Sequence, residues 1–351
     1  SATAQNRNHG YKITSAALLG YTYANDRWRF NIRTPFKMYN ISFRDKILSE
    51  HFVKNTPFID FNASFNYKAS PFLRFNGSAG MTNRIGDIMD FIRGEIRKSY
   101  NTAAVSASGV LEHNQARNAR LGYEYRHTMN GIFSSIDVLY SKTQRNIING
   151  SDISENGSIS TSAKDTKYFS DNFSGSLTFS KSLQEIKTVL SLNSALSYSA
   201  NKRMRQNVIT PYTNRSVMLE PKINFGYFER FSLICRGNAL LSKLTTGTTV
   251  NDNETYSFNA EMTGLIVKNL ELYYNLTYAD NPVSANKRER LWFMDCGARY
   301  QPVRALELEL TLYNLADIRY YNRIMYYETD VVETSYPLRP VTVLVSLKYR
   351  F

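Results

Sequence analysis

The side chains most able to do chemistry in this 351-residue chain are two cysteines, four histidines and a dispersed set of charged residues. Cys235 and Cys296 fall in predicted strands that are not neighbours in the expected order, so we expect no disulfide between them. The histidines show no metal-ligand spacing with each other or with the cysteines. The chain has no phosphate-binding loop, nucleophile elbow, zinc-protease pair or paired-cysteine motif. We therefore predict no enzyme, no metal site and no cofactor.

The charged residues recur singly along segments in which polar and apolar residues alternate. The clearest segment sets the leucines of 306–312 against Glu307, Glu309 and Thr311. Side chains alternate across a strand, and glutamates facing a dry core would be costly, whereas glutamates facing water would not. We expect one face of such strands to meet lipid and the other a wet interior. The candidates for this water-facing set are Arg29, Arg33, Asp60, Arg74, Glu124, Arg126, Arg299, Glu307 and Glu309.

Each candidate in this set has two interpretations. It can meet a solute inside the barrel, or it can pair with a charge on a neighbouring strand in a solvated interior. The second interpretation is the plainer one for any single residue.

The composition excludes a bundle of membrane-spanning helices. The mean hydropathy is −0.40, and no run of apolar residues is long enough to span a bilayer. A polar chain with 25 Tyr and 20 Phe suits a β-barrel with a wet interior. The net charge of +13 is dispersed over many segments, which favours lipopolysaccharide phosphates or an anionic solute over nucleic acid as partner. No linker divides the chain, so residues 1–351 are predicted to form one barrel domain.

The alternation predicts an all-β, antiparallel transmembrane barrel with about fifteen strands of roughly ten residues. Short turns, such as Asn25-Asp26, alternate with longer loops, so the long loops all lie on one side, which is extracellular in this class. The long loops are predicted at Ile41 to Thr56, Asn83 to Asn118, Arg145 to Lys167, Asn201 to Arg215, Thr245 to Glu254, Asp280 to Glu289 and Leu315 to Pro337. Because single-chain bacterial barrels have even strand numbers, an odd count predicts that earlier strands are missing.

The end of the chain carries a family resemblance. The stretch Leu312-Tyr-Asn-Leu-Ala-Asp-Ile-Arg-Tyr-Tyr321, followed by Ser335 to Phe351, resembles the ending of TonB-dependent outer-membrane receptors. Asn314, Leu315 and Asp317 match that pattern, while Ala316 stands where an aromatic is usual. The Tyr-rich loop and the Leu-Arg-Pro step at 338–340 look most like the Bacteroidota branch. The alternating last strand ends on an aromatic, and the resemblance assigns Tyr349 and Phe351 to an insertion signal.

The resemblance implies a fold and a function. The chain would be the C-terminal part of a 22-stranded barrel in the Gram-negative outer membrane, with a plug and a TonB-contacting region in an N-terminal part not in this chain. The implied function is TonB-dependent uptake of a surface-bound glycan, peptide or metal chelate. A surface lipoprotein is a further possible partner. The loop aromatics would meet the ligand or anchor the barrel at the interface: Tyr320, Tyr321, Tyr326, Tyr327 and Tyr336.

Two other functions stay open at this stage. A structural barrel could hold surface lipoproteins without transport, using its large loops as an interaction surface. A passive porin would need only a complete barrel with an even strand number. A plug upstream of Ser1 would favour the transporter over both.

Overall fold

The structure, a computed structural model, describes residues 8–46, 50–87, 95–99, 102–105, 111–155, 159–226, 230–284, 287–326 and 331–350. All regular secondary structure in these residues is β-strand, which confirms the predicted all-β class. The described residues contain no helix long and apolar enough to cross a membrane. An 18-stranded sheet contains nearly all of the strands, and a separate two-stranded sheet contains the other two.

The strands are long, and successive strands pair mostly as antiparallel hairpins. The first ten are β1 Asn8–Ala24, β2 Trp28–Asp45, β3 Glu50–Ile59, β4 Phe61–Lys68, β5 Leu73–Ile85, β6 Glu95–Ser99, β7 Thr102–Val105, β8 His113–His127, β9 Ile132–Ile153 and β10 Ile159–Leu183. The others are β11 Thr188–Arg205, β12 Val208–Phe225, β13 Phe231–Thr246, β14 Thr249–Val267, β15 Leu270–Ser284, β16 Lys287–Val303, β17 Leu306–Tyr313, β18 Tyr320–Tyr326, β19 Val331–Pro337 and β20 Thr342–Tyr349.

β3 and β4 form one continuous traverse of the sheet. Both pair with β2 in the same register, because Ile59 lies opposite Phe36 and Asn62 lies opposite Arg33. The residue between them, Asp60, donates its N–H to the carbonyl of Pro35 at 2.9 Å. Proline has no N–H to return, so the ladder is interrupted at that point without a change of direction.

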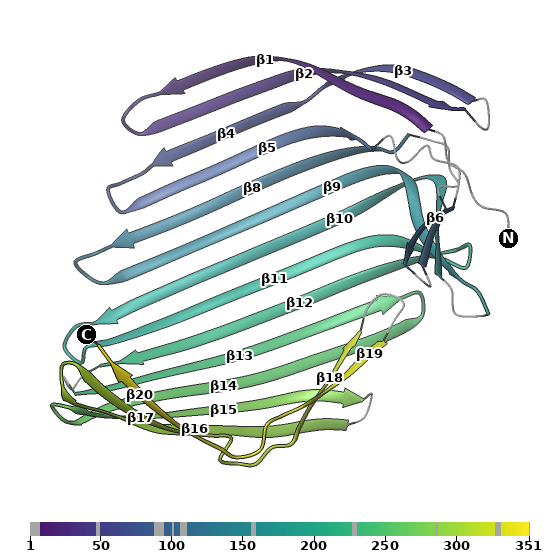
Figure 1. Ribbon diagram of the computed structural model, residues 1–351. Coiled ribbons are helices and arrows are strands. Elements are labelled where there is room, and N and C mark those ends of the chain that lie inside the picture. The colour runs from purple at the N-terminus through teal and green to yellow at the C-terminus, as the bar shows by residue number, and fades with distance from the viewer. Residues whose placement is uncertain are drawn as a thin grey trace.

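The described wall has fifteen traverses, as the alternation predicted. β6 and β7 form a short hairpin beside the far end of β10, and β18 and β19 form the second sheet, so neither hairpin crosses the wall. β1 pairs only with β2 and β20 only with β17 among the described strands. Figure 1 shows the result as a strongly curved sheet, with β1 along its upper edge and β20 at the curled lower end.

The two ends of the strands differ, as Figure 1 shows. Turns of at most five residues join the strands at the left end in that view, which we call the short-turn end. The right end, which we call the far or long-connection end, carries the β6–β7 and β18–β19 hairpins, although some of its connections, such as that between β11 and β12, are equally short. Much of what the sequence predicted as long loops is in fact paired strand. β9 and β10 stay paired out to Ile153 and Ile159, and β11 and β12 out to Arg205 and Val208. The loop predictions for 145–167 and 201–215 were therefore wrong over most of their length, because polar residues pair there through the backbone without apolar alternation.

The cross-strand register divides the side chains between two faces. We call the face that carries Leu308 and Leu310 the apolar face, and the face that carries Glu307 and Glu309 the polar face. One row of register partners on the apolar face comprises Leu121, Val138, Gly175, Leu196, Val217 and Leu241. Large apolar side chains on this face are open: Val345 is 71% exposed and Leu347 is 66% exposed.

The buried apolar residues form only small clusters at the far ends of the strands. One joins Tyr39, Ile41, Phe43, Ile85 and Leu111. This cluster lies at the far end of β2 and includes Ile85 at the end of β5. Lys12 of β1 donates hydrogen bonds to the carbonyls of Ile85 and Gly86 at 3.1 and 2.8 Å. The other joins Ile148, Tyr168 and Met204. Neither cluster covers the apolar face along the middle of the sheet.

Candidate functional site: the charged polar face

The predicted water-facing residues all fall on the polar face. They lie on β2, at the junction of β3 and β4, and on β5, β8, β16 and β17, and by register they share one side of the sheet: Arg29, Arg33, Asp60, Arg74, Glu124, Arg126, Arg299, Glu307 and Glu309. They do not converge on one point. They divide instead into paired clusters and single exposed arginines.

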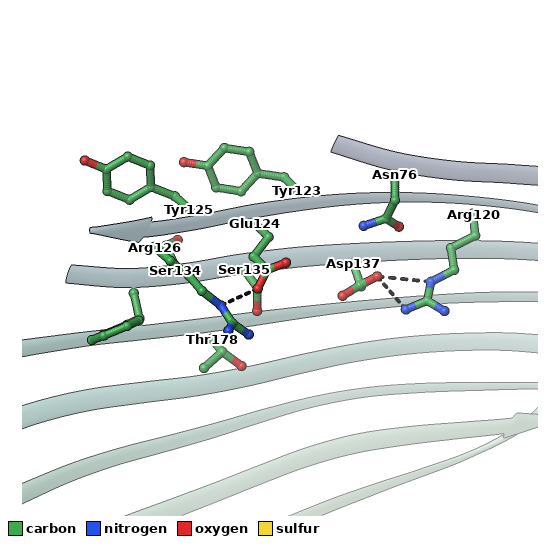
Figure 2. Close-up of a pocket in the computed structure, with 11 residues that line it drawn as sticks. Asn76, Arg120, Tyr123, Glu124, Tyr125, Arg126, Ser134, Ser135, Asp137 and Thr178 are labelled. Carbon is green, nitrogen blue, oxygen red and sulfur yellow. Dashed lines mark hydrogen bonds and ion pairs between the residues drawn. The ribbon is translucent and has the colours of Figure 1, made fainter. Parts of the chain in front are cut away.

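The first cluster lines a pocket of about 400 Å³ on β8 and β9. Asp137 accepts hydrogen bonds from Nε and Nη2 of Arg120 at 3.0 and 2.7 Å. Arg126 forms an ion pair with Glu124. Figure 2 shows both pairs side by side, while Tyr123 and Tyr125 of the same strand point away from them.

Arg120 and Asp137 were not predicted from the sequence. Both lie on the polar parity of adjacent strands, since Arg120 is opposite Leu139 and Asp137 is opposite Gly122. A register derived from the short turn at residues 128–131 would have placed them diagonally across from each other, within reach of long side chains. The signal was therefore present in the sequence, but it depended on a cross-strand register rather than on a motif.

Three predicted arginines have no ion-pair partner within the described part of the chain. Arg74 lies directly opposite Glu124 in the β5–β8 register, but Glu124 pairs with Arg126 instead. Arg29 lies opposite Asn66, and Arg33 lies opposite Asn62. All three side chains are exposed, so these cations are available to a ligand or a covering segment.

The second cluster, which we call the charged network, consists of Glu271, Arg299, Glu307, Glu309, Lys348 and Arg350 on β15, β16, β17 and β20, with Arg350 directly after β20. Arg299 lies 3.4 Å from Glu271, 3.6 Å from Glu307 and 3.2 Å from Glu309. The charged network contains three carboxylates and three cations, so its charges balance. The network therefore ties four neighbouring strands together without a net charge to attract a solute.

The cations of β20 and a tyrosine complete the charged network. Lys348 lies 3.0 Å from Glu307 and 3.5 Å from Glu309, and Arg350 lies 3.8 Å from Glu307. The Tyr273 hydroxyl donates to Glu309 at 3.1 Å and lies 2.5 Å from the Thr311 hydroxyl. Each glutamate of β17 thus has more than one partner.

Asp60 is not solvated, although the sequence placed it with the water-facing residues. The residue is 2% exposed, and its carboxylate lies 2.6 Å from Nζ of Lys37. It also accepts hydrogen bonds from the backbone and side-chain amides of Asn83 at 2.8 and 3.0 Å. Buried charges are tolerated when they are paired and hydrogen-bonded in this way. Asp60 therefore fastens β5 to the β3–β4 junction and offers no free carboxylate.

His113 stands beside this group, at the far end of β8. Its ring lies 4.7 Å from that of Phe58, and its Nε2 is 3.4 Å from Oδ1 of Asn83. Burial, and secondarily the positive charge of Lys54, hold the pKa of His113 below its ordinary value. The ring belongs to a packed cluster. No group of three or more metal-ligating side chains occurs in the described ranges.

The predicted loop aromatics play different parts in the structure. Tyr320 and Tyr336 are 60% and 52% exposed. Tyr321 instead accepts a hydrogen bond from Asn281 at 3.0 Å and packs against Phe293 of the polar face, with ring centroids 6.3 Å apart. Tyr326 is half-buried in β18. Tyr327 lies outside the described residues.

The β18–β19 hairpin is held over the far end of β15 and β16. Besides the Tyr321 contacts, the backbone N–H and the side-chain amide of Asn322 donate to Glu289 at 3.1 and 3.2 Å. Ile324 of β18 is 3% exposed. The hairpin thus covers part of the polar face and presents Tyr320 and Tyr336 outward.

The Asn-Leu-Ala-Asp turn owes its residue types to backbone geometry. Asn314 and Asp317 both have positive φ, 54° and 51°, a region that Asn and Asp tolerate better than most residues. The Asn314 side chain accepts from Ile318 N–H at 3.0 Å and donates to the carbonyls of Ile318 and Arg339 at 2.8 and 2.7 Å. This turn therefore fixes the step into β20. On β20, Tyr349 is exposed on the apolar face, and Phe351 lies outside the described residues.

Comparisons with known proteins give a fold likeness without a sequence relative. No family model matches the chain, and no curated protein matches it in sequence. The ferric-catecholate import receptor Fiu from E. coli has a TM-score of 0.44 at 9% identity, over 97% of this chain and 62% of that protein. The ferric preacinetobactin receptor BauA from Acinetobacter baumannii has a TM-score of 0.47 at 10% identity, over 93% of this chain and 55% of that protein.

A third similar structure is FpvA from P. aeruginosa, bound to heterologous pyoverdines, with a TM-score of 0.44 at 8% identity. It is matched over 99% of this chain and 71% of its own length. The chain thus spans 62% and 55% of the lengths of Fiu and BauA. These likenesses concern the course of the strands.

Proposed function

We propose that this chain forms the C-terminal wall of a 22-stranded outer-membrane barrel that imports a surface-bound nutrient by TonB-dependent transport. The observation that carries the membrane part is the exposed apolar face. Soluble monomers rarely expose large contiguous apolar patches, whereas a spanning barrel turns such a face to lipid. The polar face, with its charges and half-buried polar residues, would then line the lumen.

The two unpaired edges support a larger barrel. A lipid bilayer does not tolerate open sheet edges, so β1 and β20 need further strands to pair with. Both strands run toward the short-turn side: β1 ends at the turn to β2, and Arg350, directly after β20, donates to the carbonyl of Ala305 in the β16–β17 turn at 2.8 Å. Only an odd number of added strands closes such a pair of edges in antiparallel fashion. A 22-stranded barrel would add seven.

The transport part of the proposal rests on the resemblance at the end of the chain. The Asn314 and Asp317 turn, the Leu-Arg-Pro step and the terminal aromatic strand are similar to the endings of TonB-dependent receptors of the Bacteroidota type. A plug and a TonB-contacting segment would belong to an N-terminal region outside this chain, and the long-connection side would face the medium. The ferric-catecholate import receptor and the ferric preacinetobactin receptor noted above make a metal chelate one candidate cargo, beside a glycan or a peptide.

Transport and conductance measurements test this function. We expect the native protein, purified from outer membranes and placed in planar bilayers, to show no steady open channel, because a plug fills its lumen. Uptake of the surface-bound nutrient into cells should be lost when the proton gradient is dissipated or TonB is removed. A steady conductance with gradient-independent uptake would support the passive porin instead.

A scaffold barrel that holds a surface lipoprotein is the second candidate. The exposed Tyr320 and Tyr336 and the strand pairs on the long-connection side offer it an interaction surface. Co-purification of a lipoprotein from native membranes, together with the absence of any energised uptake, would favour the scaffold over the transporter.

A further inference from the structure

A groove of about 520 Å³ interrupts the apolar face across β13 to β17. Gly264, Cys296 and Ala298 line its floor, while Phe231, Met262 and Leu310 stand among its walls. Its volume lies within the roughly 300–1,000 Å³ of pockets that hold small ligands. Because the groove opens on the apolar face, whatever fills it must itself be apolar.

Small residues create the groove where their neighbours are large. In the register across the sheet, Gly264 lies between Phe231 and Leu272, and Ala298 lies between Leu272 and Leu310. A Cβ added at Gly264 would meet only a Phe231 ring carbon at 3.9 Å and the Arg230 carbonyl at 4.0 Å. The depression is therefore open space that a side chain could fill.

Basic side chains flank the groove at the short-turn end. Arg230 lies in the β12–β13 turn, Lys268 in the β14–β15 turn and Arg304 in the β16–β17 turn, and all three are exposed. None of them forms an ion pair with another described residue. These turns are two strands apart, which corresponds to roughly 10 Å between neighbouring cations.

Backbone hydrogen bonds tie two of these turns to the neighbouring strand, β14 or β16. Leu265 N–H donates to the carbonyl of Arg230 at 2.7 Å, and Gln301 N–H donates to that of Asn269 at 2.9 Å. The three turns that carry the cations therefore follow one another along the short-turn end of the strands that form the apolar groove. This arrangement matches a ligand with a long apolar tail and an anionic head.

We propose that the groove binds one acyl chain of an anionic phospholipid, whose phosphate lies among Arg230, Lys268 and Arg304. A membrane helix, with a diameter of about 10–12 Å, is too wide for a depression of this volume, whereas an acyl chain is slender enough. The proposal requires only that the apolar face meets lipid and goes beyond the transport function. Failure of transport would leave it untouched.

The test is retention of lipid after detergent extraction. The native full-length protein is reconstituted in vesicles of equal phosphatidylglycerol and phosphatidylcholine, extracted, and weighed by native mass spectrometry. We expect about one bound phosphatidylglycerol, retained roughly tenfold over phosphatidylcholine. Lys268→Gln should lower that preference about fivefold, because each cation near an anionic surface contributes about 1 kcal/mol.

Matched variants separate the groove from general lipid contact. Gly264→Leu fills the groove and should abolish retention, while Ala119→Leu adds a similar bulk, three carbons against four, to the apolar face of β8 and should not. Lys187→Gln removes an exposed cation from the β10–β11 turn and serves as the control for Lys268→Gln. Equal retention of both lipids, or unchanged retention in Gly264→Leu, would overturn the proposal. If Gly264→Leu does not fold, the lysine pair decides it.

Discussion

The two ends of the wall treat the charges of the polar face differently. On β15 to β20, Arg299 and Lys348 are each shared among glutamates of neighbouring strands. On β2 to β5, Arg29, Arg33 and Arg74 point out from the same face without an ion-pair partner in the described ranges. The charged side chains of the polar face therefore have two different roles. Where the charges pair they hold strands together, and where they do not they remain free to meet an anion.

The largest effect should follow from breaking the most buried pair. Lys37→Met would leave the Asp60 carboxylate buried with only amide partners, at a cost of about 3 kcal/mol in the free energy of unfolding. Urea titration of the native protein in vesicles measures it. The double variant Lys37→Met with Asp60→Asn removes the stranded charge and should recover most of the loss. No recovery would mean that Lys37 acts through packing instead.

A smaller loss is expected at the charged network. Arg299→Gln removes a cation shared by three glutamates, and we expect a loss of about 1–2 kcal/mol, moderated because the guanidinium is partly exposed. The same titration gives the value. A matched change, Arg33→Gln, at an arginine without an ion-pair partner in the described ranges, should alter stability by less than about 0.5 kcal/mol. Equal losses at both positions would erase the distinction between paired and unpaired charges.

The unpaired arginines should instead affect anions. Replacing Arg29, Arg33 and Arg74 together by glutamine removes three exposed cations from the polar face. If the proposed plug is removed so that the proposed barrel conducts, this variant should shift the selectivity from anions toward cations, because fixed charges in a pore set local ion concentrations. Reversal potentials in a salt gradient measure the shift. Arg299→Gln, whose charge is already balanced by glutamates, should change the selectivity less.

The smallest effect concerns pH at the far end of β8. The pKa of His113 is lowered in the folded protein by burial and by Lys54, so the folded state favours the neutral ring. Its contribution to stability is present above the ordinary histidine value of 6.5 and is lost as the pH falls below that value. The protection factors of the β5 and β8 ends against hydrogen exchange, corrected for the intrinsic pH dependence of exchange, should therefore fall below about pH 6. A His113→Gln variant should lack this dependence.

Most of the wall could be predicted from the sequence, but the far ends of its strands could not. Alternation located the fifteen traverses, because polar and apolar side chains of the middle segments take opposite faces of the sheet. Towards the far ends the alternation is lost, so residues such as Arg145 to Ile153 pair through the backbone without a periodic signal, and Ile148 is buried in a local cluster. The partners of Asp60 could not be predicted from the sequence either. Lys37 and Asn83 are brought to it by register and by the overlap of β5 with β3, which no local pattern reports.

The site residues were predicted by face but not by role. Parity placed Arg299 and Arg33 on the same side, yet only the register decides that Arg299 lies opposite Glu309 while Arg33 lies opposite Asn62. The motif at Asn314 was recognised as a resemblance, and its physical reason, positive φ with three side-chain hydrogen bonds to the backbone, became clear only from the fold.

The central claim, that the apolar face meets lipid and the polar face water, is tested most directly by two neighbouring residues of β20. Val345 and Leu344 are both aliphatic, both exposed, and lie on opposite faces. Val345→Arg in the native protein should reduce the free energy of folding into a bilayer by about 2–4 kcal/mol, whereas Leu344→Arg should change it little. Equal effects of the two substitutions would contradict the account.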